Sequence, residues 1–298
     1  MPVRLLGRTG FIFMFNWFKT IDPLWFSLGP LLVFNVFMLG TVLYFRRVRK
    51  TQSLPDAEKY LDNRHHSKLL NKWMKEYWYW LTSPVERLAI KWGMTPNFFT
   101  SMGFLLSCLA GLAFYFGRFG MGGWLMIIGG SCDMFDGRVA RATGNMTKSG
   151  AFYDSVMDRY GELVTFIGLA VFYRESFILW FVLGAIVGST MVSYNRARGQ
   201  AIGIDCDGGS MQRSERIVYL GVGSIFSPVF AALLKPLIEL PLDFMLRGAI
   251  ILIALMTNGT ALFRLKWIFD QLDAKEPMNQ KSKDSAEKST FELQKQGS

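Results

Sequence analysis

Two neighbouring stretches decide the fold: residues 122–144 read GGWLMIIGGSCDMFDGRVARATG, and residues 150–173 read GAFYDSVMDRYGELVTFIGLAVFY. Each is long and apolar enough to cross a membrane, which takes about 20 residues. Four aspartates nevertheless lie inside them, at positions 133, 136, 154 and 158. A carboxylate inside a span costs at least about 2.5 kcal/mol and marks a functional site by default.

The spacing of these aspartates predicts that they meet. Asp133 and Asp136 are three residues apart and Asp154 and Asp158 are four apart, so each pair shares one helix face. A short loop near Met146 makes the two helices antiparallel. Counted outward from that loop, Asp136 matches Asp154 in depth and Asp133 matches Asp158. We therefore expect four carboxylates to converge at one end of a helix pair.

Four carboxylates so close together cannot all stay ionised without protons or cations to offset their charge. Hard oxygen ligands without histidine or thiolate suit Mg²⁺, Mn²⁺ or Ca²⁺. Two such ions about 4 Å apart form the usual arrangement for displacement at phosphorus. From the residues alone two readings stay open, a metal site for phosphoryl transfer and a pathway for cations. The surrounding glycines alone fit helix packing in lipid equally well.

The composition agrees with a membrane protein. Of 298 residues 51% are hydrophobic and only 19% are charged, against about 25% charged in a soluble domain. This excludes a disordered chain and disfavours a soluble one. The net charge of +10 is interpreted as lysine and arginine on the cytoplasmic side, so no nucleic acid partner is predicted. The three cysteines form no disulfide or zinc pattern.

The remaining apolar stretches set the topology. An uncharged run at 24–45 is followed by the basic cluster 46–50, which places that end in the cytoplasm. Six further spans are predicted at about 98–117, 122–142, 150–173, 177–197, 216–236 and 243–268. The prediction is a multi-pass protein of the cytoplasmic (inner) membrane with its active site facing the cytoplasm.

Four regions follow from these patterns. We expect an N-terminal anchor with an extra transmembrane helix at 1–50 and an amphipathic segment on the cytoplasmic surface at 51–97. A six-helix catalytic membrane domain is expected at 98–270. Residues 271–298, rich in lysine, glutamate, serine and glutamine, are expected to form a disordered cytoplasmic tail.

The carboxylates belong to a longer pattern, D-x2-D-G-x2-A-R-x8-G-x3-D-x3-D, which begins at Asp133 and ends at Asp158. This pattern resembles the signature of the CDP-alcohol phosphotransferases, and the resemblance covers roughly residues 75–270. It implies an all-α integral membrane enzyme with a six-helix core and an interfacial amphipathic helix. Here one extra N-terminal transmembrane helix is added. Such enzymes use a CDP-linked donor, release CMP and form homodimers.

The resemblance also implies roles for single residues. Asp133, Asp136 and Asp154 would bind two metal ions, Mg²⁺ or Mn²⁺. Asp158 would share in metal binding and act as the catalytic general base. The CDP site would be lined by Gly137, Ala140, Arg141, Ser149 and Gly150, with Arg141 on the diphosphate.

A second cluster points to the acceptor. The segments SYNRARGQ at 193–200 and QRSER at 212–216 are similar to those of prokaryotic phosphatidylinositol-phosphate synthases, which join CDP-diacylglycerol and inositol 1-phosphate. The acceptor phosphate would be held by Arg196, Arg198, Arg213 and Arg216. Gln200 and Gln212 stand where this group usually has acidic residues.

Alternatives to this acceptor remain open. The arginines also fit a simple excess of positive charge on the cytoplasmic side. The same chemistry could use glycerol 3-phosphate, free inositol or serine as the acceptor. A cation transporter is the alternative from another functional class.

Overall fold

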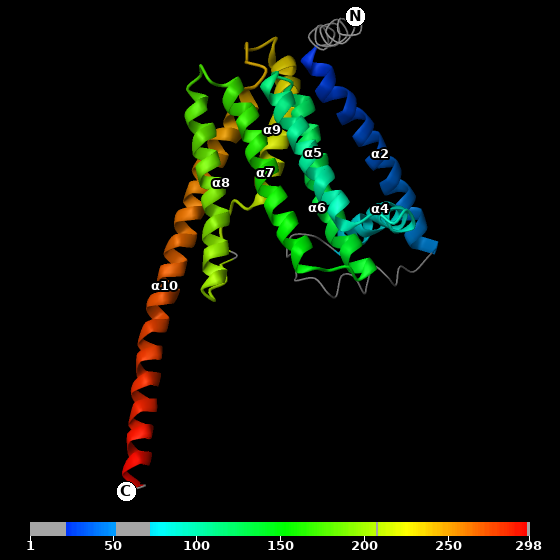
Figure 1. Ribbon diagram of the computed structural model, residues 1–298. Helices are drawn as coiled ribbons and strands as arrows, with labels where there is room; N and C mark the ends of the chain where they lie inside the picture. The colour runs from blue at the N-terminus through cyan, green and yellow to red at the C-terminus, as the bar shows by residue number, and fades with distance from the viewer. Residues whose placement is uncertain (1–21, 52–71, 207, 297–298) are drawn as a thin grey trace, which may run out of the picture. The chain divides into compact units, whose positions relative to one another are not determined.

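The computed structural model describes residues 22–51, 72–206 and 208–296. Within these ranges all regular secondary structure is helical, which confirms the predicted all-α class (Figure 1). The helices are α2 (Pro23–Thr51), α4 (Lys72–Lys91), α5 (Pro96–Tyr115), α6 (Phe119–Thr143), α7 (Lys148–Phe172), α8 (Ile178–Ala201), α9 (Arg213–Leu234) and α10 (Phe244–Gln296).

Five of the described helices are long and apolar enough to cross a membrane: α2, α5, α8, α9 and α10. The other two predicted spans coincide with α6 and α7, each of 25 residues. These two helices contain aspartates, a glutamate and arginines and are therefore less apolar than the other five. The extra N-terminal helix and the six later spans are therefore all present as helices.

The chain divides into two compact units. The first comprises residues 1–172 and 220–247, and the second comprises residues 173–219 and 248–298. The segment predicted as one six-helix domain at 98–270 thus contributes to both units.

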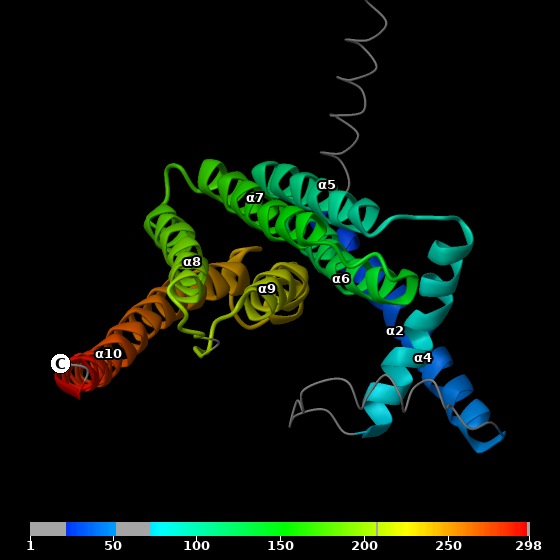
Figure 2. The ribbon, with the colours of Figure 1, turned by 60° about the horizontal axis from the view of Figure 1, so that its bottom comes forward.

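In the first unit α5 lies beside both α6 and α7, as Figures 1 and 2 show. Glycines let the backbones touch. A side chain added at Gly103 of α5 would lie 3.1 Å from the carbonyl oxygen of Gly129 in α6. One added at Gly168 of α7 would lie 2.0 Å from the carbonyl oxygen of Gly111 in α5. Small residues permit this close packing of helices in lipid.

The turn between α6 and α7 is short, as predicted. α6 ends at Gly144, whose φ of 68° is the left-handed conformation that glycine tolerates best. Thr147 then precedes α7, and its hydroxyl accepts a hydrogen bond of 3.0 Å from the backbone N–H of Gly150. This cap satisfies one of the free N–H groups at the start of α7. The two aspartate-bearing helices are therefore joined in the expected antiparallel hairpin.

In the second unit α8 and α10 contact each other through glycine and amide groups. A side chain at Gly188 would lie 2.2 Å from the Thr257 hydroxyl. The Asn258 side chain donates to the Gly184 carbonyl at 2.9 Å, and the Asn195 side chain donates to the Ala261 carbonyl at 2.9 Å. Polar groups inside these spans are thus satisfied by the neighbouring helix.

The C-terminal region differs from the prediction. Residues 271–296 were expected to be disordered, but the structure continues α10 through them to Gln296. Alanine, glutamate, lysine and glutamine are good helix formers, which explains why a polar sequence can extend a helix. Residues 1–21 of the predicted anchor and 52–71 of the predicted surface segment lie outside the described residues.

Candidate active site

Three of the four predicted aspartates come together in the first unit. One carboxylate oxygen each from Asp133 on α6 and from Asp154 and Asp158 on α7 lie within 4.8 Å of one another. All three residues are partly buried, and Oδ1 of Asp154 is fully so. A compact set of carboxylate oxygens drawn from two helices is the ligand type that Mg²⁺ and Mn²⁺ prefer. The residues present therefore fit a divalent metal site.

The fourth aspartate is turned to a different neighbour. Asp136 is buried, with 8% of its surface exposed, and its Oδ2 accepts a hydrogen bond of 2.9 Å from the Thr100 hydroxyl on α5. Asp136 lies one turn from Asp133 on the same helix, so it borders the three-carboxylate group. Thr100 was not identified from the sequence, because a threonine one turn into an apolar helix carries no distinguishing pattern.

The position of Asp133 follows from the packing of α5 on α6. A side chain added at Gly103 would lie 3.3 Å from Cβ of Cys132 and 3.8 Å from Oδ1 of Asp133. The missing side chain at this position is therefore what lets α5 lie directly against the aspartate-bearing turn of α6. On the other flank of α5, the Ser101 and Tyr153 hydroxyls are 2.9 Å apart and link α5 to α7.

The residues predicted to bind CDP lie on either side of the α6–α7 turn. A side chain added at Gly137 would lie 3.3 Å from the guanidinium of Arg141, so this glycine leaves the room in which the guanidinium lies. Arg141 and Ser149 are exposed, whereas Ala140 is partly buried. The Ser149 hydroxyl donates to Thr147 Oγ1 at 3.3 Å. An exposed cation and a hydroxyl near the carboxylates are suited to a phosphorylated ligand.

The predicted acceptor arginines belong to the second unit. Arg196 and Arg198 are exposed in the last turns of α8, and Arg213 is partly exposed at the start of α9. Arg216 is different, because only 1% of its surface is exposed and its Nη1 donates to the Met211 carbonyl at 3.1 Å. The sequence pattern did not separate this buried arginine from the exposed ones.

A second buried arginine of this unit is not among the predicted site residues. Arg264 on α10 is 3% exposed; its Nε donates to the Gly208 carbonyl and its Nη1 to the Val192 carbonyl, both at 2.8 Å. Arg264 thus connects α10 both to the loop before α9 and to α8. Nothing in the local sequence shows this, since both acceptors are backbone atoms distant along the chain.

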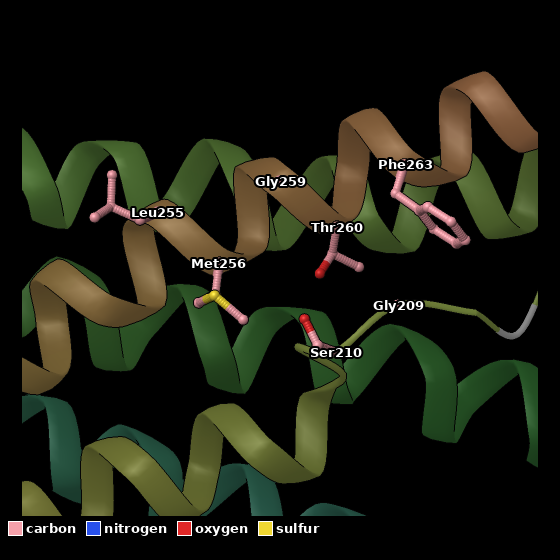
Figure 3. Close-up of a pocket in the computed structure, with 7 residues that line it drawn as sticks. All are labelled: Gly209, Ser210, Leu255, Met256, Gly259, Thr260 and Phe263. Atoms are coloured by element: carbon pink, nitrogen blue, oxygen red, sulfur yellow. The ribbon is translucent and has the colours of Figure 1, made fainter.

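The second unit also contains a cavity of about 540 Å³, shown in Figure 3. It is lined by Gly209, Ser210, Leu255, Met256, Gly259, Thr260 and Phe263. The hydroxyl groups of Ser210 and Thr260 point toward one another there, while the other lining atoms are largely apolar. None of these described lining residues has a titratable side chain.

Comparison with known proteins agrees with the family that the aspartate pattern resembles. A family model described as CDP-alcohol phosphatidyltransferase matches residues 93–269. An archaetidylinositol phosphate synthase from Pyrococcus horikoshii is 35% identical over 151 residues, which are 49% of this chain and 79% of that protein. A phosphatidylinositol phosphate synthase from Mycolicibacterium smegmatis is 31% identical over 206 residues, covering 67% of this chain and 88% of that protein.

Solved structures show the same fold. The crystal structure of Mycobacterium tuberculosis phosphatidylinositol phosphate synthase with CDP-DAG bound matches with a TM-score of 0.55 and 28% identity, covering 63% of this chain and 93% of that one. The same enzyme in complex with manganese and citrate matches equally well, with a TM-score of 0.55. The matched region includes every residue of the aspartate pattern, and the chain belongs to the CDP-alcohol phosphatidyltransferase family of membrane enzymes.

Proposed function

We propose that this protein transfers the phosphatidyl group of CDP-diacylglycerol to inositol 1-phosphate, forming phosphatidylinositol phosphate and releasing CMP. The proposal rests on one observation in a chain of this family: carboxylate oxygens of Asp133, Asp154 and Asp158 lie within 4.8 Å of one another. The choice of acceptor is supported by relatives named phosphatidylinositol phosphate synthase and archaetidylinositol phosphate synthase.

The carboxylates of Asp133, Asp136, Asp154 and Asp158 would hold two divalent ions, Mg²⁺ or Mn²⁺. Bound ions of this kind neutralise a diphosphate and the charge that develops on a leaving phosphate. Arg141 would add a permanent cation at the diphosphate, and Gly137 would keep the space that its guanidinium needs. Ala140, Ser149 and Gly150 would border the same nucleotide.

Asp158 would act as the general base. It accepts the proton of the acceptor hydroxyl while that oxygen attacks the phosphorus carrying diacylglycerol. The bond from this phosphorus to the CMP oxygen breaks, and CMP leaves. A carboxylate that also ligates a metal is not a strong base, but it needs only to accept this proton as the acceptor oxygen attacks.

The acceptor phosphate would be bound by Arg196, Arg198 and Arg213, which have exposed or partly exposed side chains. Guanidinium groups bind phosphate oxygens in bidentate geometry. Arg216, predicted with them, is buried against the Met211 carbonyl, so its role would be to hold the segment before α9. We place the active site at the cytoplasmic face of the inner membrane, in a homodimer.

One assay tests the proposal. Purified protein with Mg²⁺ or Mn²⁺ and CDP-diacylglycerol is given inositol 1-phosphate, inositol, glycerol 3-phosphate or serine, and CMP release is measured. CMP release with inositol 1-phosphate far above the other acceptors is expected. Equal rates with unphosphorylated inositol would contradict the acceptor, and metal flux into proteoliposomes without nucleotide would favour the transporter.

A further inference from the structure

The helix that carries Asp133 and Asp136 is fastened from behind by a buried arginine. Arg138 on α6 has a side chain only 2% exposed, and its Nε donates to Oε2 of Glu86 on α4 at 2.7 Å. Its Nη2 also pairs with the Glu86 carboxylate, and its Nη1 donates to the Thr82 hydroxyl. The guanidinium carbon lies 4.9 Å from the centre of the Tyr79 ring. All these partners lie on α4.

This contact is made on a different face of α6 from the aspartates. At 3.6 residues per turn, Arg138 lies about 140° around the helix from Asp133. α4 makes a second buried contact with α6, because Ala89 belongs to a buried cluster with Val139 and Cys132. Nε and Nη2 both contact Oε2 of Glu86 while Nη1 is held by Thr82, so the buried guanidinium is fixed by two residues of α4, and these contacts restrict rotation of α6 about its axis. Rotation of α6 would move Asp133 relative to the two aspartates of α7.

α4 is in turn fastened to the extra N-terminal helix. Phe45 of α2 is fully buried, and its ring centre lies 5.3–5.8 Å from the ring centres of Trp73, Tyr77 and Trp80 on α4. The Thr41 and Tyr77 hydroxyls are 2.8 Å apart. Nη2 of Arg49 and Oε2 of Glu76 form an ion pair at 2.9 Å. Aromatic and ionic contacts therefore join α2 and α4 firmly.

α2 also touches α6 directly, near the start of α6. A side chain added at Gly120 would lie 1.9 Å from the Ser27 hydroxyl and 3.0 Å from the Ser27 backbone nitrogen. The rings of Phe34 and Trp124 are 5.7 Å apart. Gly120 lies 18 residues before Arg138, or roughly 27 Å along the helix. α6 is thus held near both of its ends.

We propose that α2 and α4 form a brace that fixes the orientation of α6, with Arg138 as the positioning residue that transmits it to the carboxylate site. α2 and α4 both precede residues 93–269, which the family model matches, and α2 is the helix that the six-helix core does not include. The inference depends on the proposed metal site. Its ligand is a divalent cation, and its observable consequence is the affinity of the carboxylates for that cation.

The main test measures Mn²⁺ binding calorimetrically to the purified full-length protein. Removal of a group that orients a metal ligand typically lowers metal affinity about 10- to 100-fold. Glu86→Gln and Arg138→Lys are each expected to weaken Mn²⁺ binding about tenfold and to lower kcat, with the KM for the acceptor almost unchanged. The matched control is Glu175→Gln. It removes the ion pair between Glu175 and Arg174, in which the Glu175 side chain is 85% exposed.

A double variant separates positioning from general destabilisation. If Glu86 and Arg138 act as one unit, Glu86→Gln combined with Arg138→Lys weakens Mn²⁺ binding no more than either change alone. Gly120→Val attacks the other end of the brace by separating α2 from α6, and it is expected to weaken Mn²⁺ binding in the same direction. Thermal unfolding confirms that each variant is folded at the temperature of the titration.

The outcomes are distinguishable. Unchanged Mn²⁺ affinity in folded Glu86→Gln and Arg138→Lys protein overturns the brace, even where the unfolding temperature falls. Absence of Mn²⁺ binding to the unaltered protein instead overturns the proposed metal site itself. Weakened binding in both variants, with the control unaffected, supports the brace.

Discussion

The carboxylates of the α6–α7 hairpin and the arginines of the second unit are both charges within mostly apolar helices, but their surroundings differ. Asp133, Asp154 and Asp158 bring charges of one sign within 4.8 Å of each other. Arg216 and Arg264 instead donate to backbone carbonyls of their own unit. A group of like charges gains from an added cation, whereas an arginine with carbonyl acceptors stabilises the fold. The grouping of like charges, and not charge alone, is therefore what makes the aspartates a candidate for metal binding.

Removal of divalent metal is expected to have the largest effect, and it acts on the aspartates and not on the arginines. A chelator is expected to reduce CMP release to background, and added Mg²⁺ or Mn²⁺ to restore it. Metal at about 100 times its Kd should stabilise the folded protein by about 2.7 kcal/mol, seen as a higher unfolding temperature. Asp133→Asn should lose this stabilisation. Full activity in the presence of chelator would show that the carboxylates need no cation.

Replacement of the proposed base comes next. Asp158→Asn is expected to lower CMP release by about 10²- to 10⁴-fold, the usual contribution of a general base. Without metal the variant should unfold at the same or a higher temperature, because one of three mutually repelling charges is gone. Asp270→Asn, at an exposed position on α10, is the control and should change neither quantity. Turnover within a few fold of the unaltered enzyme would exclude Asp158 as the base.

Replacement of Arg264 is expected to lower the stability of the fold and to leave metal binding unchanged. Arg264→Gln removes the donors to the Gly208 and Val192 carbonyls and is expected to destabilise the fold by about 1–3 kcal/mol. Mn²⁺ affinity of the folded fraction should stay unchanged. Lys266→Gln, an exposed neighbour on α10, serves as the control. An unchanged unfolding temperature together with weaker metal binding would reverse the assignment of Arg264.

The smallest expected effect concerns the acceptor. Arg213→Ala is expected to raise the KM for inositol 1-phosphate about tenfold, as the loss of about 1.4 kcal/mol of phosphate binding would. The KM for CDP-diacylglycerol should hardly change. Arg174→Ala, which alters an exposed arginine between α7 and α8, is the control. Equal increases in both KM values would mean that Arg213 does not act on the acceptor.

Much of the fold could be predicted because lipid imposes strong rules on sequence. The length of the apolar runs predicted the helices. Residue spacing predicted that four aspartates converge, and the structure groups three of them, Asp133, Asp154 and Asp158. In a helix, residues three or four apart lie on the same face, whatever the rest of the chain does. The short turn after α6, with glycine at its end, followed from the same local information.

Contacts between distant residues could not be predicted in this way. The pairing of Arg138 with Glu86 joins residues 52 apart, and the hydrogen bond from Thr100 to Asp136 joins residues 36 apart. Both depend on how whole helices pack. The burial of Arg216 was missed because its sequence neighbours resemble those of an exposed basic cluster. The role proposed for α2 depends on its contacts with α4 and α6, which the sequence does not reveal.

The glycine contacts of α5 have a consequence for robustness. Where Gly111 meets Gly168, and Gly103 meets Gly129, one peptide backbone rests on another with no side chain between. Backbone atoms have no rotamers, so thermal repacking of side chains leaves these spacings unchanged. The distances from α5 to α6 and from α5 to α7 therefore depend on these glycines, and a larger residue at any of them would move apart the two helices that carry the aspartates.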